Sequence, residues 1–362
     1  MSRPVTSIDV ARLAGVSQSA VSRSFTAGAV VSEDMRKKVF EAARKLGYRP
    51  NAIARTLITN RSRIIGVVVS YLENQFYPVV LEGLSRQLRQ SGYHLLLFCP
   101  DTQDADDLLA EILQYQVDGI VLASTTLSSA LAHSCADAGI PVVLFNRTVR
   151  NSPSSSVAVD NAGGGRLVAK LLCEAGHRRI GFIAGLEDTS TSRDRETGFM
   201  EGLAAHGERC WARAVGDYRF DGAVRATHAL CAGSSRPDAL FVANDHMAIA
   251  VMDTLRLDLG LRVPDDVSVV GFDDVPQAAW GSYRLTTVRQ PAASMIEATV
   301  ALLVKQLDEE QTERVDVVLP AELVLRSSAR LPTPAQRAAP APRTNDTGNE
   351  REPHDRSPSP PR

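Results

Sequence analysis

The sequence predicts a small all-α helix-turn-helix head followed by an α/β body of two similar parallel-sheet lobes with a ligand cleft between them. Three observations lead to this fold class. Residues that are favoured at helix ends recur along the head and separate its helices. From Ile64 onward, near-continuous Val/Ile/Leu runs alternate with helical segments, which is typical of parallel sheets covered on both faces. These runs form two comparable halves that meet near "SVAVDNAGGG".

Two helices joined by a short turn open the chain. Thr6 is expected to cap the first helix, with Asp9 three residues later in a capping-box-like arrangement. Gly15 ends that helix, because glycine is favoured just after a helix, and Ser17 caps the second. The apolar stripe of the first helix is expected to consist of Val10, Leu13 and Ala14.

A third helix is expected between a capping serine, Ser32, and a terminating glycine, Gly47. "YRPN" then breaks the chain, and Asn51 can cap a short fourth helix that ends at Leu57. The buried side of the third helix is expected to consist of Met35, Val39, Ala43 and Leu46.

Seven strands are expected in the body, and two late segments, "LTTVRQP" and "LPAELVLRSS", are expected to cross back between the lobes. Three glycines open a helix in "DNAGGGRLVAK", but their spacing matches neither a dinucleotide fingerprint nor a Walker A loop. Close helix–strand packing is therefore expected there, with Asp160 as a helix cap rather than a ligand contact. The strands read "IIGVVVS", "YHLLLFC", "GIVLAS", "PVVLFN", "RRIGFIAG", "ALFVAN" and "VSVVGFDD".

The chain is expected to have four parts: a helix-turn-helix domain (1–50), a hinge helix and linker (51–63), a two-lobe domain with a ligand cleft (64–330) and a disordered tail (331–362). The tail holds eight of the 19 prolines and lacks apolar periodicity, which indicates disorder.

The net charge of −2 hides an asymmetry. Up to Arg63 the chain has 12 Lys/Arg and 4 Asp/Glu, against 28 and 38 in the remainder. A basic head on an acidic body indicates that the head, and not the body, binds a polyanion.

Five scattered cysteines without a C-x-x-C pair indicate reduced thiols, and the histidines lack metal-binding spacing, so no metal site is expected. The N-terminus lacks the apolar run of a signal peptide, and no stretch approaches the roughly 20 apolar residues of a membrane helix. We therefore expect a cytoplasmic protein without a membrane partner.

The second helix, within "GVSQSAVSRSF", has two unlike sides at about 100° per residue. Its polar side can hydrogen-bond base edges and phosphates in a major groove, while its apolar side docks on the other helices. The alternative is an ordinary solvated amphipathic helix, which the basic charge of the head disfavours. The polar side consists of Gln18, Ser19, Ser22 and Arg23, and the other side of Ala20, Val21, Ser24 and Phe25.

Leu57 ends the short fourth helix among Arg55, Arg61 and Arg63. It is either a linker leucine that packs on the core or an apolar wedge that enters the minor groove from a helix formed on DNA.

Many motifs are similar, in order, to those of the LacI/GalR family of bacterial transcription regulators, over about residues 4–330. The head and linker contribute "VTSIDVARLAGVSQSAVSRSF", "VSEDMRKKVFEAARKLGYRPNAIARTL" and "RIIGVVV". The body contributes "FNR", "VDNAGGG", "GHRRIGFIAG", "SRDRETGF", "LFVANDHMAIAVM", "VSVVGFDDVPQAAW" and "LTTVRQP".

This resemblance implies a repressor that binds a pseudo-palindromic operator in double-stranded DNA as a homodimer. It also implies that a small-molecule effector, bound between lobes like those of type I periplasmic binding proteins, controls operator affinity allosterically. The tail has no leucine heptads, which favours a dimer over the tetramer of some members.

The resemblance assigns operator contacts to the head and hinge. Gln18 and Ser19 match a pair that sets operator preference, Arg23 matches a base-reading arginine, and Leu57 matches a leucine that two subunits insert side by side. The expected DNA-binding set is Thr6, Ser17, Gln18, Ser19, Ser22, Arg23, Asn51, Arg55 and Leu57.

The resemblance also assigns an effector site. Asp273 matches an acidic acceptor, Arg195 a donor, and Tyr218, with Phe220 as the alternative, a stacking aromatic ring. The alternative, purely structural roles of Asp273, Arg195 and Tyr218 are a strand-end cap, a surface ion pair and a core tyrosine, respectively. Two asparagines match polar cleft positions, and a three-residue loop matches a lip where many members have Asn-Pro. These are Asn146, Asn244, Gln75, Phe76 and Tyr77.

A carboxylate, an arginine, amides and an aromatic ring together suit a small polyhydroxylated ligand. A sugar or sugar derivative is therefore the expected effector, with a nucleobase as the alternative. An α/β oxidoreductase is disfavoured because the chain has no dinucleotide fingerprint and no nucleophile–base constellation, so no enzymatic activity and no cofactor are expected. A transport binding protein shares the two-lobe body but not the basic head.

Overall fold

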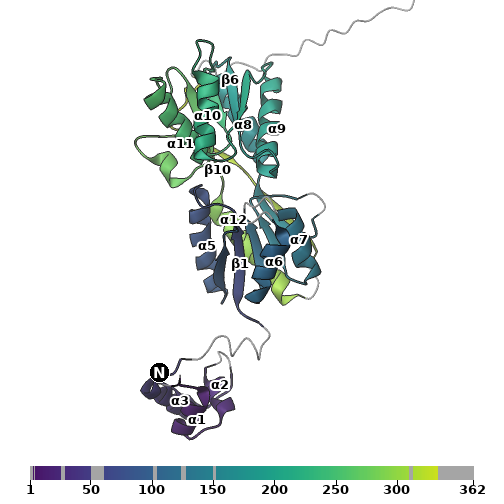
Figure 1. Cartoon of the computed structure of the whole chain (residues 1–362), viewed down its shortest axis with the longest axis vertical. Helices are drawn as coiled ribbons and strands as arrows, with labels where there is room; N and C mark the ends of the chain where they lie inside the picture. Colours follow the sequence, from purple (N-terminus) through teal and green to yellow (C-terminus); the bar gives the residue numbers. More distant parts are fainter. Residues whose placement is uncertain are drawn as a thin grey trace, which may run out of the picture. The chain divides into compact units, whose positions relative to one another are not determined.

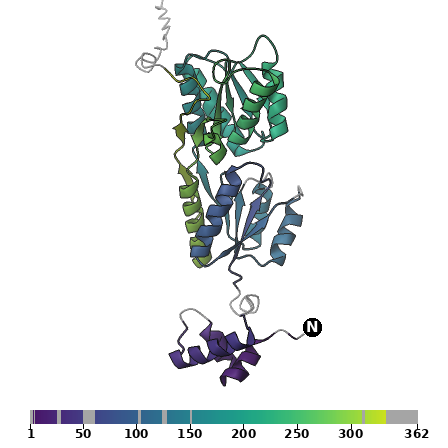
Figure 2. The same cartoon turned by 90° about the vertical axis from the view of Figure 1, so that its left-hand side faces the viewer.

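The computed structural model of the chain describes residues 3, 5–25, 29–49, 61–100, 104–123, 128–149, 152–309 and 313–332 (Figures 1 and 2). Its contacts define two compact units, Met1–Ile64 with Tyr115–Asp118 and Ile65–Gln114 with Gly119–Arg362. The expected fourth helix and the tail beyond residue 332 lie outside the described residues. None of the described helices is long and apolar enough to cross a membrane.

The head contains the three helices that the sequence predicts: α1 (Ser7–Ala14), α2 (Gln18–Ser24) and α3 (Glu33–Leu46). The capping box of α1 is confirmed. The Asp9 N–H donates to the Thr6 hydroxyl, and the Asp9 carboxylate accepts from the Thr6 N–H at 2.9 Å. Ser17 and Ser32 cap α2 and α3 in the predicted way, and Gly15 ends α1 with a φ of +66°.

These helices pack around a small apolar core. Ser24 is buried and donates to the Ala20 carbonyl at 2.8 Å, as expected for the inner side of α2. The expectation for Leu13 was wrong, because it is 52% exposed and Ala11 is buried beside Val10 instead. The core residues are Val10, Ala11, Val21, Val39, Ala42 and Ala43.

Lobe 1 of the body has a six-stranded sheet in the order β11-β5-β4-β3-β1-β2. The β1/β3, β3/β4, β4/β5 and β5/β11 pairs are parallel. Helix α5 packs against α12, and α6 packs against α7 (Figure 2). The elements are β1 (Ile64–Val69), α5 (Phe76–Gln90), β2 (His94–Phe98), α6 (Ala105–Gln114), β3 (Gly119–Ala123), α7 (Ser128–Asp137), β4 (Val142–Phe145), β5 (Ser155–Val159), α12 (Ala292–Asp308) and β11 (Asp316–Leu319).

Lobe 2 repeats this plan with the strand order β12-β10-β9-β8-β6-β7. Its pairs are parallel except that β12 runs antiparallel to β10. The elements are α8 (Asn161–Glu174), β6 (Ile180–Ala184), α9 (Ser190–Ala205), β7 (Ala212–Val215), α10 (Phe220–Cys231), β8 (Ala239–Val242), α11 (Asp245–Asp253) with a π-helical turn (Thr254–Asp258), β9 (Ser268–Asp273), a 3₁₀ turn (Pro276–Ala279), β10 (Thr286–Arg289) and β12 (Glu322–Val324).

All seven expected strands are present, and the chain crosses between the lobes three times. The crossings follow β5, β10 and β11, the last two within or beside the segments expected to cross. The Asp160 N–H donates to the Leu319 carbonyl at 2.8 Å, so the first and third crossings lie side by side. Asp160 also accepts from the Gly163 N–H at 2.7 Å, which confirms it as the cap of α8.

Glycines let α8 approach its neighbours closely. A Cβ on Gly164 would lie 2.5 Å from the Phe272 ring of β9, which confirms the expected helix–strand packing. A Cβ on Gly165 would lie 2.3 Å from the Arg195 carbonyl oxygen, and one on Gly198 would lie 1.9 Å from a carbonyl oxygen of α8. Backbone-to-backbone contact between α8 and α9 therefore fixes the position of Arg195.

Candidate functional sites

Helix α2 presents a continuous polar face on the head. Gln18, Ser19, Ser22 and Arg23 are all exposed, whereas the opposite side of the helix is buried. The Gln18 amide donates to the Ser7 hydroxyl at 3.1 Å, so the first turn of α1 holds this side chain. Side chains of this kind, on a helix supported from behind, suit a major groove.

The other expected DNA contacts do not belong to this polar face of α2. Thr6 and Ser17 serve as helix caps, and Ser17 also shares a hydrogen bond of 3.0 Å with the Ser19 hydroxyl. The remaining three expected contacts lie outside the described residues: Asn51, Arg55 and Leu57.

A small cavity of about 10 Å³ lies between the lobes. This volume is far below the range of roughly 300–1,000 Å³ for small-molecule sites, so a small molecule fits between these walls only when the lobes stand further apart. Its wall groups follow β1, β4, β7, β8 and β9, or lie on the helices α5 and α9, as expected for a ligand site at the carboxyl ends of parallel strands. The lining residues are Tyr71, Asn74, Tyr77, Asn146 and Arg147 of lobe 1, and Thr191, Arg195, Tyr218, Asn244 and Asp273 of lobe 2.

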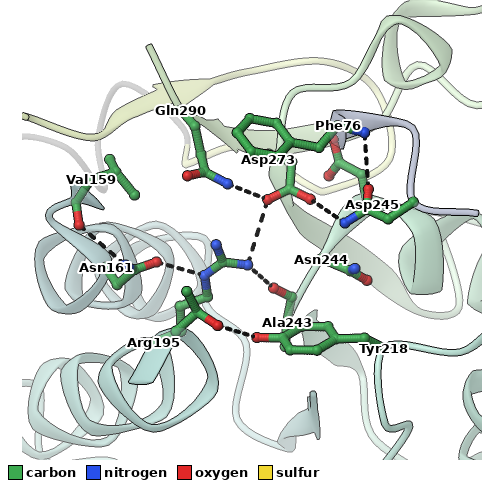
Figure 3. Close-up of polar contacts among 12 residues, drawn as sticks. Phe76, Val159, Asn161, Arg195, Tyr218, Ala243, Asn244, Asp245, Asp273 and Gln290 are labelled. Carbon is green, nitrogen blue, oxygen red and sulfur yellow. Dashed lines mark hydrogen bonds and ion pairs between the residues drawn. The ribbon is translucent and has the colours of Figure 1, made fainter. Parts of the chain in front are cut away.

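Asp273, at the end of β9, is the centre of the cavity's polar contacts (Figure 3). Its carboxylate accepts from the Gln290 amide at 2.7 Å and from the Asn74 amide at 3.4 Å, and lies 3.5 Å from Nη1 of Arg195. Its φ of +131° is strained for a residue with a side chain. Burial raises the pKa of this carboxyl, although the Arg195 charge opposes the shift. The bonds to Gln290 and Asn74 are side-chain bonds, unlike those of a strand-end cap.

Arg195 is 2% exposed, so the alternative of a surface ion pair is wrong. Its Nε donates to Oδ1 of Asn161 at 2.8 Å, and its Nη1 donates to the Ala243 carbonyl at 2.6 Å (Figure 3). The guanidinium lies 3.7 Å over the Phe272 ring. These contacts all belong to lobe 2, so the cation keeps one position whatever the other lobe does.

Two asparagines leave one buried polar atom each without a hydrogen-bond partner among the described residues. Asn244 caps α11 through its Oδ1, which accepts from the Met247 N–H at 2.9 Å, and its Nδ2 is the atom left over. Asn146, with a φ of +57°, leaves its Oδ1. The two atoms thus leave one donor and one acceptor on the cavity wall that a ligand or water can pair with.

Tyr218 lines the cavity and is buried, with its hydroxyl 3.1 Å from Oγ1 of Thr191. It has a φ of +59°, and its ring packs on Gly185, where a Cβ would lie 2.2 Å away. Phe220 is 43% exposed at the start of α10 and contacts the His246 ring rather than the cavity wall. Of the two expected aromatics, the cavity contains Tyr218.

The three residues of the expected lip segment, Gln75, Phe76 and Tyr77, have different positions in the structure. Tyr77 lines the cavity, whereas Phe76 is buried in lobe 1 and stacks on Phe145 at a centroid distance of 6.3 Å. Gln75 is not on the cavity wall, because its amide oxygen accepts from Nε2 of Gln277 at 3.2 Å.

The sequence reasoning missed four wall residues: Tyr71, Asn74, Arg147 and Thr191. Two of them, Asn74 and Arg147, adjoin expected residues and carry polar side chains in the loops that follow β1 and β4.

Asp245 is a further acid that the sequence reasoning missed, and it is fully buried behind the cavity. It accepts from the Thr287 hydroxyl at 2.5 Å and from the Val275 N–H at 3.0 Å. Burial, together with the nearby Asp273 carboxylate, raises the pKa of Asp245 to about 7. Among the described residues, no three His, Cys, Asp or Glu side chains are grouped as a metal site.

Known proteins resemble both parts of the chain. Residues 8–51 match the family of bacterial regulatory proteins named lacI, and residues 169–329 match a periplasmic binding protein-like domain. The HTH-type transcriptional regulator CelR of Thermobifida fusca is 36% identical over 329 residues, which cover 88% of this chain and 96% of CelR.

Two solved structures extend this likeness. A complex of the transcriptional regulator CelR with cellobiose is 34% identical, with a TM-score of 0.69 over 90% of this chain and 100% of that one. A Lac repressor dimer bound to operator and the anti-inducer ONPF is 28% identical, with a TM-score of 0.81 over 90% and 99%. With this identity over nearly its whole described length, the chain belongs to the lacI family of bacterial regulatory proteins.

Proposed function

We propose that the chain is a cytoplasmic repressor without enzymatic activity, which binds a pseudo-palindromic operator as a homodimer. A small carbohydrate bound between the lobes controls its operator affinity. The observation that carries the effector proposal is the cavity wall, where Asn146 and Asn244 offer one acceptor and one donor beside Asp273. Hydroxyl groups both donate and accept, so a polyhydroxylated ligand pairs with all three groups, and the Tyr218 ring supplies apolar surface.

Similar proteins of known structure support the same function. The CelR structure contains a disaccharide, cellobiose, and the Lac repressor structure contains operator DNA. The exposed polar face of α2 is the head surface that fits a major groove, and the head carries the chain's excess of positive charge.

A titration tests the effector proposal. Calorimetry with cellobiose, glucose and a purine base is expected to show binding of a sugar but not of the purine. Asp273→Asn keeps the shape of the side chain but removes its charge, and is expected to weaken sugar binding about 10- to 150-fold, since a hydrogen bond to a charged group contributes about 1.5–3 kcal/mol. Asp266→Asn, half-buried in lobe 2 and not on the cavity wall, is the matched control. Unchanged sugar affinity in Asp273→Asn would contradict the assignment.

Selection from random double-stranded DNA tests the operator proposal, because the selection itself reveals the sequence that the chain binds. The full chain is expected to select a near-palindrome with two half-sites. Arg23→Ala is expected to relax base preference at one position of each half-site, at a cost of about 1–3 kcal/mol. Arg44→Ala, exposed in the last turn of α3, removes the same charge away from α2 and is the control. Equal effects of both variants would reduce Arg23 to a phosphate contact.

Apolar surface on lobe 2 supports the homodimer. Leu257 and Trp280 are 79% and 55% exposed, on segments that a 2.6 Å hydrogen bond from Arg256 to the Ser282 carbonyl holds together. Exposed large side chains on neighbouring segments indicate an interaction surface. Sedimentation of Leu257→Arg is expected to give a monomer, and an unchanged dimer would place the interface elsewhere.

Allosteric control requires reciprocal coupling. If the bound sugar changes operator affinity by some factor, operator DNA must change sugar affinity by the same factor. A sugar that binds the cavity but leaves operator affinity unchanged would refute this part of the proposal.

A further inference from the structure

Two neighbouring amide side chains of lobe 1 contact lobe 2 across the lip of the cavity. Asn74 Nδ2 donates to Oδ2 of Asp273 at 3.4 Å, and Gln75 Oε1 accepts from Nε2 of Gln277 at 3.2 Å. Gln277 lies in the 3₁₀ turn that follows β9 and Asp273. Adjacent residues of one lobe therefore contact adjacent elements of the other.

Both amides are oriented by their own lobe. The Phe76 N–H donates to Asn74 Oδ1 at 3.0 Å, and Gln75 Nε2 donates to the Glu73 carbonyl at 3.0 Å. One half of each amide is thus bound within lobe 1, which determines which half faces lobe 2. Because the side chains are already ordered, the contacts across the lip lose little conformational entropy.

The two contacts differ in their relation to the cavity. Asn74 and Asp273 line it, so a ligand in the cavity either replaces their hydrogen bond or forms a further bond to the same side chains. Neither Gln75 nor Gln277 lines it, and both are half-buried beside it. The Gln75–Gln277 bond therefore joins the lobes without using a group that a ligand in the cavity would contact. A proline at position 75 would have no side-chain amide for this bond.

We propose that the Gln75–Gln277 pair is a clasp that favours the closed arrangement of the lobes and so raises effector affinity without touching the effector. The identity of the ligand in this proposal rests on the proposed function, whereas the closure of the two lobes does not. A partly buried neutral hydrogen bond shifts a two-state equilibrium by about 3- to 10-fold. The apparent dissociation constant rises by the same factor where closure is required for binding and the open state dominates the ligand-free protein both with and without the clasp.

Distances between the lobes test the clasp directly. Spin labels introduced through a genetically encoded keto amino acid at Arg86 of α5 and Arg225 of α10, both exposed, report the separation of lobes 1 and 2 in the full chain. Gln75→Met keeps the length of the side chain but removes the amide. It is expected to shift the ratio of short to long distances about 3- to 10-fold towards the long ones.

Two further variants separate a clasp from a general disturbance of the loop. Gln277→Met is expected to give the same shift, and the double variant no more than either single one, because both remove one bond. Gln90→Met, exposed at the end of α5, is the matched control and is expected to leave the distances unchanged. Unchanged distances in Gln75→Met, or additive shifts in the double variant, would overturn the proposal.

Cellobiose is the probe for the effect on affinity. If it binds the wild-type chain, its dissociation constant is expected to rise in Gln75→Met by about the factor seen in the distance ratio, and an unchanged constant would overturn the link to affinity. If cellobiose does not bind, a shift in the distances still supports the clasp, and only cellobiose is rejected as the effector.

Discussion

The buried acid Asp245 makes a sharp prediction about stability and pH. Asp245→Asn replaces the carboxyl with an amide of the same shape. The amide oxygen can accept from the Val275 N–H, and the amide nitrogen can donate to the Thr287 hydroxyl once that hydroxyl turns its proton away. Both hydrogen bonds are thus kept while the titration is removed.

The expected magnitude follows from the pKa of Asp245, which rises from 3.8 to about 7 on folding. The folded protein then binds this proton more tightly than the unfolded chain. The group's stabilising contribution is therefore complete below about pH 4 and is lost as the pH rises through about 7. About three pH units at 1.36 kcal/mol each give about 4 kcal/mol. The pKa of Asp273 is also raised, so part of the slope remains in the variant.

The assay is urea unfolding between pH 4.5 and 8.5, followed by tryptophan fluorescence. Both tryptophans, Trp211 and Trp280, lie in lobe 2, so the signal reports the lobe that holds Asp245. The free energy of unfolding of Asp245→Asn is expected to exceed that of the wild type increasingly above pH 5. Asp266→Asn is the control, since the pKa of Asp266 is lowered by Arg262 and its effect lies at lower pH. Parallel curves for wild type and Asp245→Asn would refute the reasoning.

Three further outcomes are expected. Gly198→Ala should destabilise lobe 2 by about 3 kcal/mol in the same unfolding assay, because a Cβ there meets a carbonyl oxygen at 1.9 Å, whereas Gly233→Ala, with no atom nearer than 3.8 Å, should not. Thr6→Ala should lower the stability of the head by about 1 kcal/mol, seen as earlier loss of helical circular dichroism on heating. Tyr218→Phe should lose about 1 kcal/mol in urea unfolding through its bond to Thr191, and retain sugar binding by calorimetry if the ring supplies the contact.

The layered fold could be predicted because its signals are local. Caps such as Thr6 and Ser17 bond to their own first turn, and buried parallel strands are continuous apolar runs. The strands β7 and β11 escaped detection because they are only four residues long and partly exposed. Leu13 was misplaced because a helix of eight residues gives too few turns to fix which side faces the core.

The candidate site was predictable only as far as family motifs reach. Asp273, Arg195 and Asn244 were found through motifs, and the cavity contains all three. Their bonding partners could not be found, because contacts such as Asn74–Asp273 join residues far apart in the sequence and depend on how the lobes meet. Gln75 was assigned to ligand binding by position, but its side chain turns to Gln277 instead.

The two lobes contribute to the cavity in different ways, and this separates the two sets of experiments. In lobe 2, Arg195 and Asp273 are held by partners of their own lobe or by the crossing residue Gln290, so they are in place before the lobes meet. In lobe 1, Asn146 keeps an acceptor without a partner among the described residues, and Asn74 reaches lobe 2 only at 3.4 Å. We therefore expect a ligand to contact lobe 2 first and lobe 1 as the lobes close. Loss of the Asp273 charge should weaken recognition itself, whereas loss of the Gln75 amide should act on closure alone.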